Sequence, residues 1–290
     1  MDTAYYLNLA FNGVVEGSIY ALGALSITLV FGIARFPNAA TGDVMTVGAF
    51  GGLAGTTLGG GVIGAILAGV AASAAVTVAF YYLLFRALAK RSAVASMIAS
   101  IGLAFFLRAA LGFFMGHDQR VYDLPLARAT LVGPLRVQPA DVQVMAAAAA
   151  ALAVTFGLLH LTPIGRRMRA VADNPDLARA SGINAGRVMV VMWLMAGALA
   201  GLAGVLLGVK TVVTPDMGWD LLLPAFAATI LGTIGNPVGA VLGGLLIGVA
   251  QELSTPFVGF TYKIGVGFAV LLLMLMIRPQ GLFARNALVR

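Results

Sequence analysis

Long apolar runs constrain the fold of this chain more than any other feature of its sequence. Residues 9–34, 62–85, 93–115, 142–161, 189–209 and 258–277 each hold at most one Lys, Arg, Asp or Glu. A helix rises about 1.5 Å per residue, so about 20 apolar residues cross a bilayer. Hydrophobic residues make up 60% of the chain and charged residues 10%, whereas soluble domains carry about 25% charged residues. We therefore predict an all-α, polytopic membrane helix bundle.

Two further apolar segments are less regular. Residues 44–58 are glycine-rich and short, and residues 221–251 hold no charge but are interrupted by Gly235-Asn236-Pro237. The second segment is too long for one upright span and too short for two full spans with a turn. It predicts a short or re-entrant helix pair near the C-terminus, which protein or water must cover. The chain then has seven full spans, or nine if this segment crosses twice.

The basic residues predict the orientation. Twelve of the 18 Lys and Arg residues lie at residue 35 and in segments 86–91, 166–187 and 278–290, and five lie in the alternate loops. Cytoplasmic loops carry an excess of Lys and Arg. We therefore expect the N-terminus outside and the C-terminus inside a bacterial inner (plasma) membrane, with lipid around the bundle. Because this topology explains the net charge of +7, no nucleic-acid partner is expected.

The polar loop 162–188 separates two membrane-length runs and carries five arginines. Within it, Asn174 can cap a helix, Pro175 suits the first helical position and Asp176 favours the positive helix end. Gly182 is a typical helix stop. These signals predict a short helix over residues 176–181 that exposes Leu177. Two interpretations stay open: a solvated linker whose arginines only fix the topology, or a docking helix that inserts into a groove on a soluble partner.

Four motifs resemble one family of transporters. Its cytoplasmic coupling segment is similar to TPIGRRMRAVADNPDLARASGIN (residues 162–184), and its first span is similar to GSIYALGALSITLVFGI (17–33). Its N-F-A-H-G-D signature resembles PNAATGD (37–43), in which Thr41 replaces the histidine, and its glycine-rich C-terminal stretch resembles ILGTIGNPVGAVLGGLLIG (230–248). Over nearly its whole length, the chain therefore resembles the membrane permeases of ATP-binding-cassette (ABC) importers of the branched-chain amino-acid (LivH) type.

This resemblance implies a transport subunit that works with other chains. The implied partners are two ABC ATPase subunits, a second permease subunit (homologous or identical) and a periplasmic or extracellular solute-binding protein. Residues 1–290 would form a single transmembrane permease domain, with residues 162–188 as its cytoplasmic coupling loop. The residues that would couple it to the ATPase are Arg169, Asn174, Pro175, Asp176, Leu177, Ala178, Ser181 and Gly182.

The sequence itself agrees that ATP is hydrolysed on another chain. A phosphate-binding P-loop needs a lysine directly after a glycine, and none of Lys90, Lys210 or Lys263 follows one. Only two histidines are present, His117 and His160, and no acid–base or metal-ligand pattern surrounds them. We therefore expect no enzymatic activity, no metal site and no cofactor bound by this chain.

Polar residues inside the apolar runs are the candidates for the transport pathway, because they are costly in lipid and usually face the protein interior. Glu16 lies one turn from Asn12 and Tyr20 on the same helix face. A salt bridge from Glu16 to Arg108 that only fixes helix packing is the competing interpretation. Segments 37–52 and 230–248, broken by Pro and Gly, also point to a transport site. The candidate pathway residues are Asn12, Glu16, Tyr20, Asn38, Thr41, Asp43 and Thr46.

Three of the charged residues have simpler explanations. Asp43 and Glu252 lie near the ends of their apolar runs and could sit at the membrane interface, and Asp43 could also cap a helix. Lys263 lies near the start of its run, where a lysine can extend to the interface. Gly243 and Gly244 are expected to let neighbouring helices approach closely.

The sequence thus predicts the permease subunit of an ATP-driven importer that forms the translocation path for a small polar solute. A branched-chain or other hydrophobic amino acid is the default that the resemblance implies, and related permeases carry urea, other amides or aromatic acids. The pathway residues do not choose between these cargoes. The alternative from another class is a secondary transporter or channel that needs no ATPase.

Overall fold

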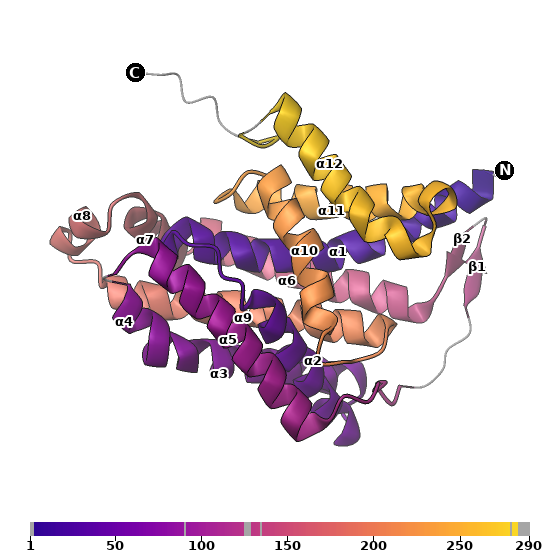
Figure 1. Ribbon diagram of the computed structural model, residues 1–290, viewed down its shortest axis with the longest axis horizontal. Helices are drawn as coiled ribbons and strands as arrows, with labels where there is room; N and C mark the ends of the chain where they lie inside the picture. The colour runs from indigo at the N-terminus through magenta and orange to yellow at the C-terminus, as the bar shows by residue number, and fades with distance from the viewer. Residues whose placement is uncertain (1–2, 90, 125–128, 134, 279, 284–290) are drawn as a thin grey trace.

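The computed structural model describes residues 3–89, 91–124, 129–133, 135–278 and 280–283, which form a helix bundle with one small β-hairpin (Figure 1). Four basic residues used for the orientation, Lys90, Arg128, Arg285 and Arg290, lie outside this part of the chain. In chain order the elements are α1 (Thr3–Ala34), α2 (Thr41–Thr57), α3 (Gly61–Phe80), a π-helical turn (Tyr81–Phe85), α4 (Arg86–Leu88), α5 (Ala93–Met115), β1 (Thr130–Val132), β2 (Leu135–Val137), α6 (Pro139–Leu161), α7 (Pro163–Asp173), α8 (Pro175–Ala180), α9 (Ala185–Lys210), α10 (Met217–Leu231), α11 (Pro237–Val258), a 3₁₀ turn (Phe260–Tyr262) and α12 (Lys263–Ile277).

Seven helices of the described chain are long and apolar enough to cross a membrane. They are α1, α3 with its continuation through α4, α5, α6, α9, α11, and α12 with the preceding 3₁₀ turn. This confirms the predicted polytopic helix bundle. Two apolar helices are shorter: α2 has 17 residues and α10 has 15.

The helix pair expected within residues 221–251 is present, but only its first helix is short. The second helix, α11, has 22 residues and continues through Glu252 to Val258. Similarly, α10 begins at Met217 and includes Asp220. The apolar run in the sequence stops at both charges, whereas the helices continue through them. A short helix followed by a membrane-length one therefore replaces the predicted pair of short helices.

The central contact of the bundle joins α1 to α11 through small residues. A Cβ atom on Gly248 would collide with the backbone of Gly17, and one on Gly244 would lie 2.5 Å from the backbone nitrogen of Ala21. A Cβ on Gly243 would likewise collide with the carbonyl oxygen of Ala228 in α10. Helices in lipid associate closely through such residues. The packing role expected of Gly243 and Gly244 is therefore confirmed.

The two short helices α2 and α10 begin inside the bundle, where their first turns meet (Figure 1). A Cβ atom on Gly218 would collide with the carbonyl oxygen of Gly42, and the Gly218 amide donates a hydrogen bond of 3.1 Å to the hydroxyl of Thr46. Non-helical segments, residues 35–40 and 211–216, precede the two helices. Such broken segments inside a membrane bundle need protein or water around their backbone.

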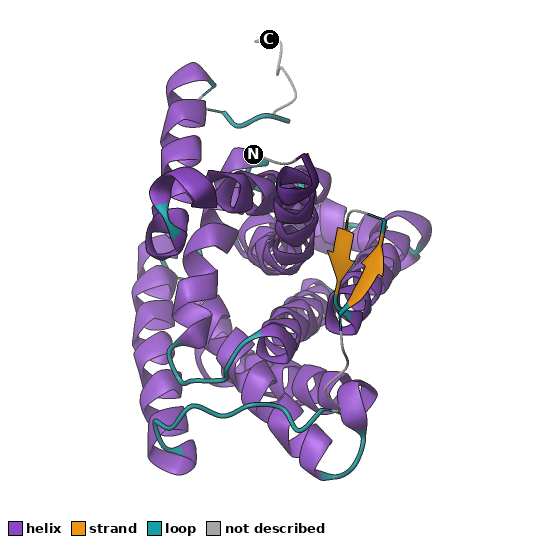
Figure 2. Ribbon diagram, turned by 90° about the vertical axis from the view of Figure 1, so that its right-hand side faces the viewer, coloured by secondary structure: helices purple, strands orange, loops and turns teal. Residues whose placement is uncertain are grey.

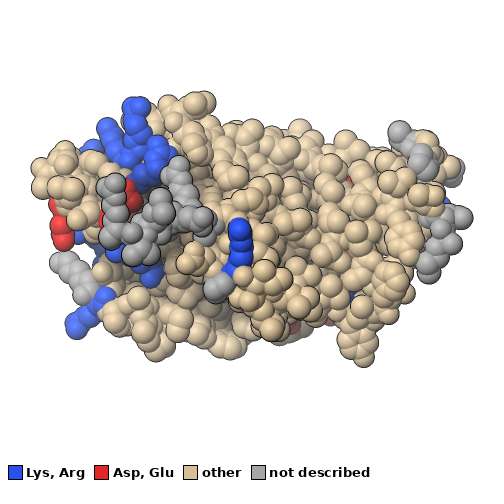
Figure 3. All heavy atoms as spheres, turned by 90° about the horizontal axis from the view of Figure 1, so that it is seen from above, with Lys and Arg blue, Asp and Glu red and all other residues tan. Residues whose placement is uncertain are grey.

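The bundle has two distinct ends. One carries the β-hairpin and the start of α1, where the Asn8 side chain accepts a hydrogen bond from the Arg136 amide (Figure 2). We call this the hairpin end. The other carries α7 and α8, and a space-filling view shows Lys and Arg side chains gathered there (Figure 3). We call it the arginine-rich end, and Arg35 joins it because its side chain bonds to the backbone of α7.

Tyr122 anchors the polar segment at the hairpin end. Its hydroxyl donates a hydrogen bond of 2.8 Å to the carbonyl oxygen of Ala49, and the hydroxyl lies close to Gly52 and Gly208, where a Cβ would collide with it or crowd it. Burial raises the pKa of the Tyr122 phenol. The upward shift widens the pH range over which the hydroxyl acts as a donor.

Candidate functional site: a capped helix and two charge clusters

The short helix α8 begins and ends at the residues that the sequence indicates. The Asn174 side-chain oxygen accepts hydrogen bonds of 3.0 Å from the amides of Asp176 and Leu177, which caps the helix. Pro175 occupies the first position. Gly182 follows the helix with φ +81°, a left-handed conformation that favours glycine. The helix spans Pro175–Ala180, one residue from the predicted bounds.

The faces of α8 differ in exposure. Leu177 is 64% exposed, whereas its neighbour Ala178 is buried against the bundle. The Ser181 hydroxyl donates to the Leu177 carbonyl oxygen at 3.0 Å, and Asp176 pairs with Arg179 at 3.1 Å on the exposed surface. The predicted exposure of Leu177 is confirmed. An exposed leucine on a capped helix gives this end of the molecule an apolar contact point between charged residues.

Two arginine side chains fasten the coupling segment to the bundle. Arg169 of α7 donates a hydrogen bond of 2.7 Å to the carbonyl oxygen of Leu159 in α6. Arg35, directly after α1, donates bonds of 2.7 and 3.1 Å to the carbonyl oxygens of Ala172 and Asp173 at the end of α7. Arg35 itself ends α1 in the left-handed region, at φ 59°. Hydrogen bonds from charged groups are stronger than neutral ones, so α7 is tied to both α1 and α6.

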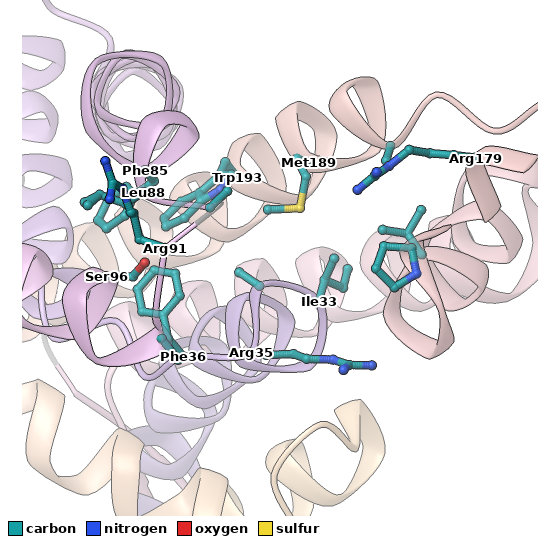
Figure 4. Close-up of a pocket in the computed structure, with 16 residues that line it drawn as sticks. Ile33, Arg35, Phe36, Phe85, Leu88, Arg91, Ser96, Arg179, Met189 and Trp193 are labelled. Carbon is teal, nitrogen blue, oxygen red and sulfur yellow. The ribbon is translucent and has the colours of Figure 1, made fainter. Parts of the chain in front are cut away.

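A cavity of about 350 Å³ lies beside α8, between α1, α5 and α9 (Figure 4). Its lining combines Arg35 and Arg179 with aromatic rings. Trp193 of α9 stacks on Phe85 of the π-helical turn with ring centres 4.6 Å apart, and Phe36 lies 5.4 Å from Phe85. The aromatic stack thus joins the segment after α1 to α9 and to the end of α3.

The first charge cluster lies where α2 and α10 begin, and it runs from the buried Asp43 to the exposed Asp216. Arg108 of α5 donates to Asp43 of α2, with Nε 3.0 Å from Oδ1 and Nη2 3.4 Å from Oδ2. Arg108 Nε also lies 3.7 Å from a carboxylate oxygen of Asp216, and the guanidinium lies over the Trp219 ring at 5.0 Å. Asp43 is fully buried and sits in the first turn of α2 without capping it. Its carboxylate is therefore neutralised inside the bundle, not placed at an interface.

The second cluster joins α1, α11 and α12. Lys263 donates hydrogen bonds of 2.9 Å to both carboxylate oxygens of Glu16 and to Glu252. The Tyr20 hydroxyl lies between Glu16, at 3.3 Å, and the side-chain oxygen of Gln251, at 3.1 Å. A charge at the centre of a membrane helix costs about 2.5–3.5 kcal/mol on insertion scales, and pairing offsets that cost. Pairing with oppositely charged side chains across helices therefore explains all three charges.

This cluster corrects three expectations from the sequence. Glu16 pairs with Lys263 and not with Arg108, whose partner is Asp43. Lys263 and Glu252 are both buried and pair with each other, so the lysine side chain points into the bundle and does not extend outward. The physical reason is the same in each case: the charged side chain pairs with an oppositely charged side chain on a neighbouring helix.

The remaining pathway candidates fall into separate places. Asn38 lies before α2 and Thr41 is its first residue; both are buried, and the Thr41 hydroxyl donates to the Asn38 carbonyl oxygen at 2.9 Å. Thr46 is buried and holds the start of α10. Asn12 lies at the hairpin end, beside a cavity of about 490 Å³. The structure therefore groups Asp43 with Thr46 and Glu16 with Tyr20, while the role of all seven residues in transport stays a prediction.

Sequence reasoning missed Asp216 and Trp219. Asp216 directly precedes α10 and Trp219 lies in its first turn, after a break whose Pro215-Asp216 pair precedes an apolar run. That pattern repeats the Pro37 break before α2 and could have identified them. It did not, because the apolar run alone set the expected start of the helix.

Broken helices that meet at a buried charge, with a capped helix exposed at one end, define a multi-pass membrane transport subunit. Residues 9–277 match the family described as branched-chain amino acid transport system, permease component, and the chain belongs to this family. It is therefore the permease subunit of an ABC importer, and ATP drives transport in this family.

Individual relatives agree over almost the whole chain. The high-affinity branched-chain amino acid transport system permease protein LivH of Escherichia coli K12 is 31% identical over 97% of this chain and 96% of its own length. The corresponding protein BraD of Pseudomonas aeruginosa is 32% identical, with the same coverage. Among solved structures, PsaBC from Streptococcus pneumoniae in complex with Fab matches with a TM-score of 0.51 and 16% identity, covering 95% of this chain and 92% of that chain. This last likeness concerns the fold alone.

Proposed function

We propose that this permease assembles with two ABC ATPase subunits, a second homologous or identical permease and a solute-binding protein outside the membrane. Residues 1–290 act as one permease domain in a bacterial inner membrane, with the hairpin end outside and the coupling loop 162–188 in the cytoplasm. This chain binds no nucleotide or other cofactor, so ATP is hydrolysed on the partner subunits. The observation that carries the proposal is α8, a capped helix that exposes Leu177 at the arginine-rich end.

The contacts of α7 and α8 provide a route by which the conformational change of the ATPase subunits, here called the ATPase stroke, reaches the helix bundle. A displacement of α8 moves the end of α7, whose carbonyl oxygens hold Arg35. Arg35 leads within six residues into α2, which carries Asp43 and meets the start of α10. The stroke therefore reaches both broken helices through main-chain connections and hydrogen bonds, without passing through a long side-chain network.

We propose a branched-chain or other hydrophobic amino acid as cargo, because LivH and BraD are permeases of branched-chain amino acid transport systems. Urea, other amides and aromatic acids are the competing cargoes within the same importer class. Ligand screening of the solute-binding protein encoded with this chain separates them, since that subunit selects the cargo. A binding protein that retains only urea or an aromatic acid would contradict the amino-acid assignment.

The coupling role is tested by changing α8 alone. Leu177→Asp places a charge at the proposed contact, so we expect loss of ATPase co-purification and of ATP-driven uptake in proteoliposomes, while the protein still folds because Leu177 is exposed. Leu177→Met, which keeps an apolar side chain, is the matched control and should retain both. Co-purification of wild-type protein with no ATPase would favour the secondary transporter or channel instead.

A second pair of variants tests the helix stop. Gly182 has φ +81°, and alanine there costs about 1–2 kcal/mol, whereas asparagine tolerates the conformation. We expect Gly182→Ala to lower uptake more than Gly182→Asn, measured beside the amount of folded protein. Equal uptake in the two variants would show that the end of α8 does not have to be held.

A further inference from the structure

A group of charged and aromatic side chains reaches the surface of the bundle where α5 passes the start of α10. The Asp216 side chain is 67% exposed and that of Arg108 is 20% exposed. Trp219 is 40% exposed, and Asp220, one residue later, is also exposed. We call Arg108, Asp216, Trp219 and Asp220 the charged face. It differs from the neighbouring surface of α5, where exposed large side chains such as Phe106 and Phe113 are apolar.

The charged face lies within the membrane thickness. Arg108 is the sixteenth of the 23 residues of α5, which places it about 22 Å from the arginine-rich end and about 10 Å from the other end of that helix. Independently, α10 runs for 15 residues from Met217 to Leu231 near the arginine-rich end, a length of about 22 Å. Hydrocarbon is about 30 Å thick, so both helices place the charges inside it, about 8–10 Å from its boundary at the hairpin end.

Exposed carboxylates at this depth cannot face lipid. Ionisable residues inside a membrane face a bundle interior or a water-filled cavity. Because the described part of this chain does not cover Asp216 and Asp220, either water or another subunit must cover this face. A second permease subunit enclosing water against this face gives the geometry of a passage between two subunits.

The charge of the face has a definite sign. Asp43 is fully buried and binds the guanidinium of Arg108 through both carboxylate oxygens. This pair has no net charge. The negative charge of the face therefore comes from the carboxylates of Asp216 and Asp220, which are exposed. Trp219 adds the face of an indole ring, which attracts cations as Arg108 shows at 5.0 Å. The groups that meet a passing solute are thus two acids and an aromatic ring.

We infer that the charged face is the cargo-facing wall of the passage and that it favours solutes bearing an ammonium group over anions. The inference rests on the proposed function, because the passage needs the second permease. A cleft lined by one sign of charge concentrates the opposite charge by about 10-fold or more. A zwitterionic amino acid presents an ammonium to Asp216 and Asp220, neutral amides are tolerated, and an acid without an amine is repelled.

The absence of cysteine from the sequence allows a direct test. Trp219→Cys is made in the assembled importer and treated with membrane-impermeant methanethiosulfonate reagents that carry either an ammonium or a sulfonate group. Each rate is divided by the rate of the same reagent with free 2-mercaptoethanol, and we expect this normalised rate to be at least about 10-fold higher for the cationic reagent than for the anionic one. Asp220→Cys, which keeps Asp216, is the second variant should the loss of the indole ring impair folding. Leu272→Cys on α12, 62% exposed, is the lipid-facing control and should react slowly with both.

The charge preference is then assigned to named residues. Adding Asp216→Asn and Asp220→Asn to Trp219→Cys should bring the ratio of the two normalised rates close to one. A thiol at position 219 or 220 that reacts no faster than the thiol on α12 would overturn the inference, as would a ratio near one with both aspartates present. ATPase co-purification and uptake are measured on the same preparations. Normal uptake with an unreactive wall contradicts only this inference, whereas charge-selective labelling without any ATPase contradicts only the proposed importer assembly.

Discussion

The buried lysine of α12 illustrates how single residues hold this bundle together. Lys263 is the shared partner of Glu16 and Glu252, on two other helices, and all three side chains are largely withdrawn from solvent. Removing one member of such a group leaves uncompensated charge in a medium of low polarity. The lysine therefore has a structural role that its position near the start of an apolar run does not reveal.

Lys263→Met is expected to destabilise the protein by about 3–5 kcal/mol, because two carboxylates then lose their counter-charge. The measurement is the thermal unfolding midpoint in detergent or nanodiscs. Combining Lys263→Met with Glu16→Gln and Glu252→Gln removes every charge of the cluster and should recover most of the loss. If Lys263→Met alone unfolds at the wild-type temperature, the cluster does not stabilise the fold.

At the scale of elements, the contact of α1 with α11 depends on the absence of side chains. Gly248→Ala puts a Cβ against the backbone of Gly17, so the helices must separate and we expect a loss of about 1–3 kcal/mol. Gly265→Ala in α12 is the matched control, because a Cβ there meets open space and alanine favours the helix by up to about 1 kcal/mol. Thermal unfolding should therefore shift down in the first variant and not in the second. Equal shifts would mean that helix propensity, not close approach, decides the effect.

The elements also show what a sequence can predict. The capped helix α8 followed from Asn174 and Gly182, since capping depends on residues a few positions apart. Long apolar helices followed from composition in the same way. The pairing of charges did not follow, because Glu16 and Lys263 are 247 residues apart and only the helix arrangement brings them together. The length of α11 was missed for the same reason: Glu252 looks like a boundary until its partner is known.

At the scale of the whole molecule, the two ends must face opposite compartments. Leu131 in the hairpin is 75% exposed and Leu177 in α8 is 64% exposed, so a cysteine at either position is accessible without disturbing the fold. In intact cells, an impermeant thiol reagent should label Leu131→Cys, whereas Leu177→Cys should react only after the membrane is opened. The proposed orientation is wrong if labelling follows the reverse order.

The hydrogen bonds from Arg35 to α7 have a consequence for how the sequence of this protein can change over evolutionary time. Its guanidinium holds the main-chain oxygens of residues 172 and 173, which every amino acid supplies. Mutations at those two positions therefore leave the attachment in place, and no compensating change at position 35 is required. The surface side chains at the end of α7 can therefore change while the link to α1 is kept, and a search for correlated substitutions would pass over it.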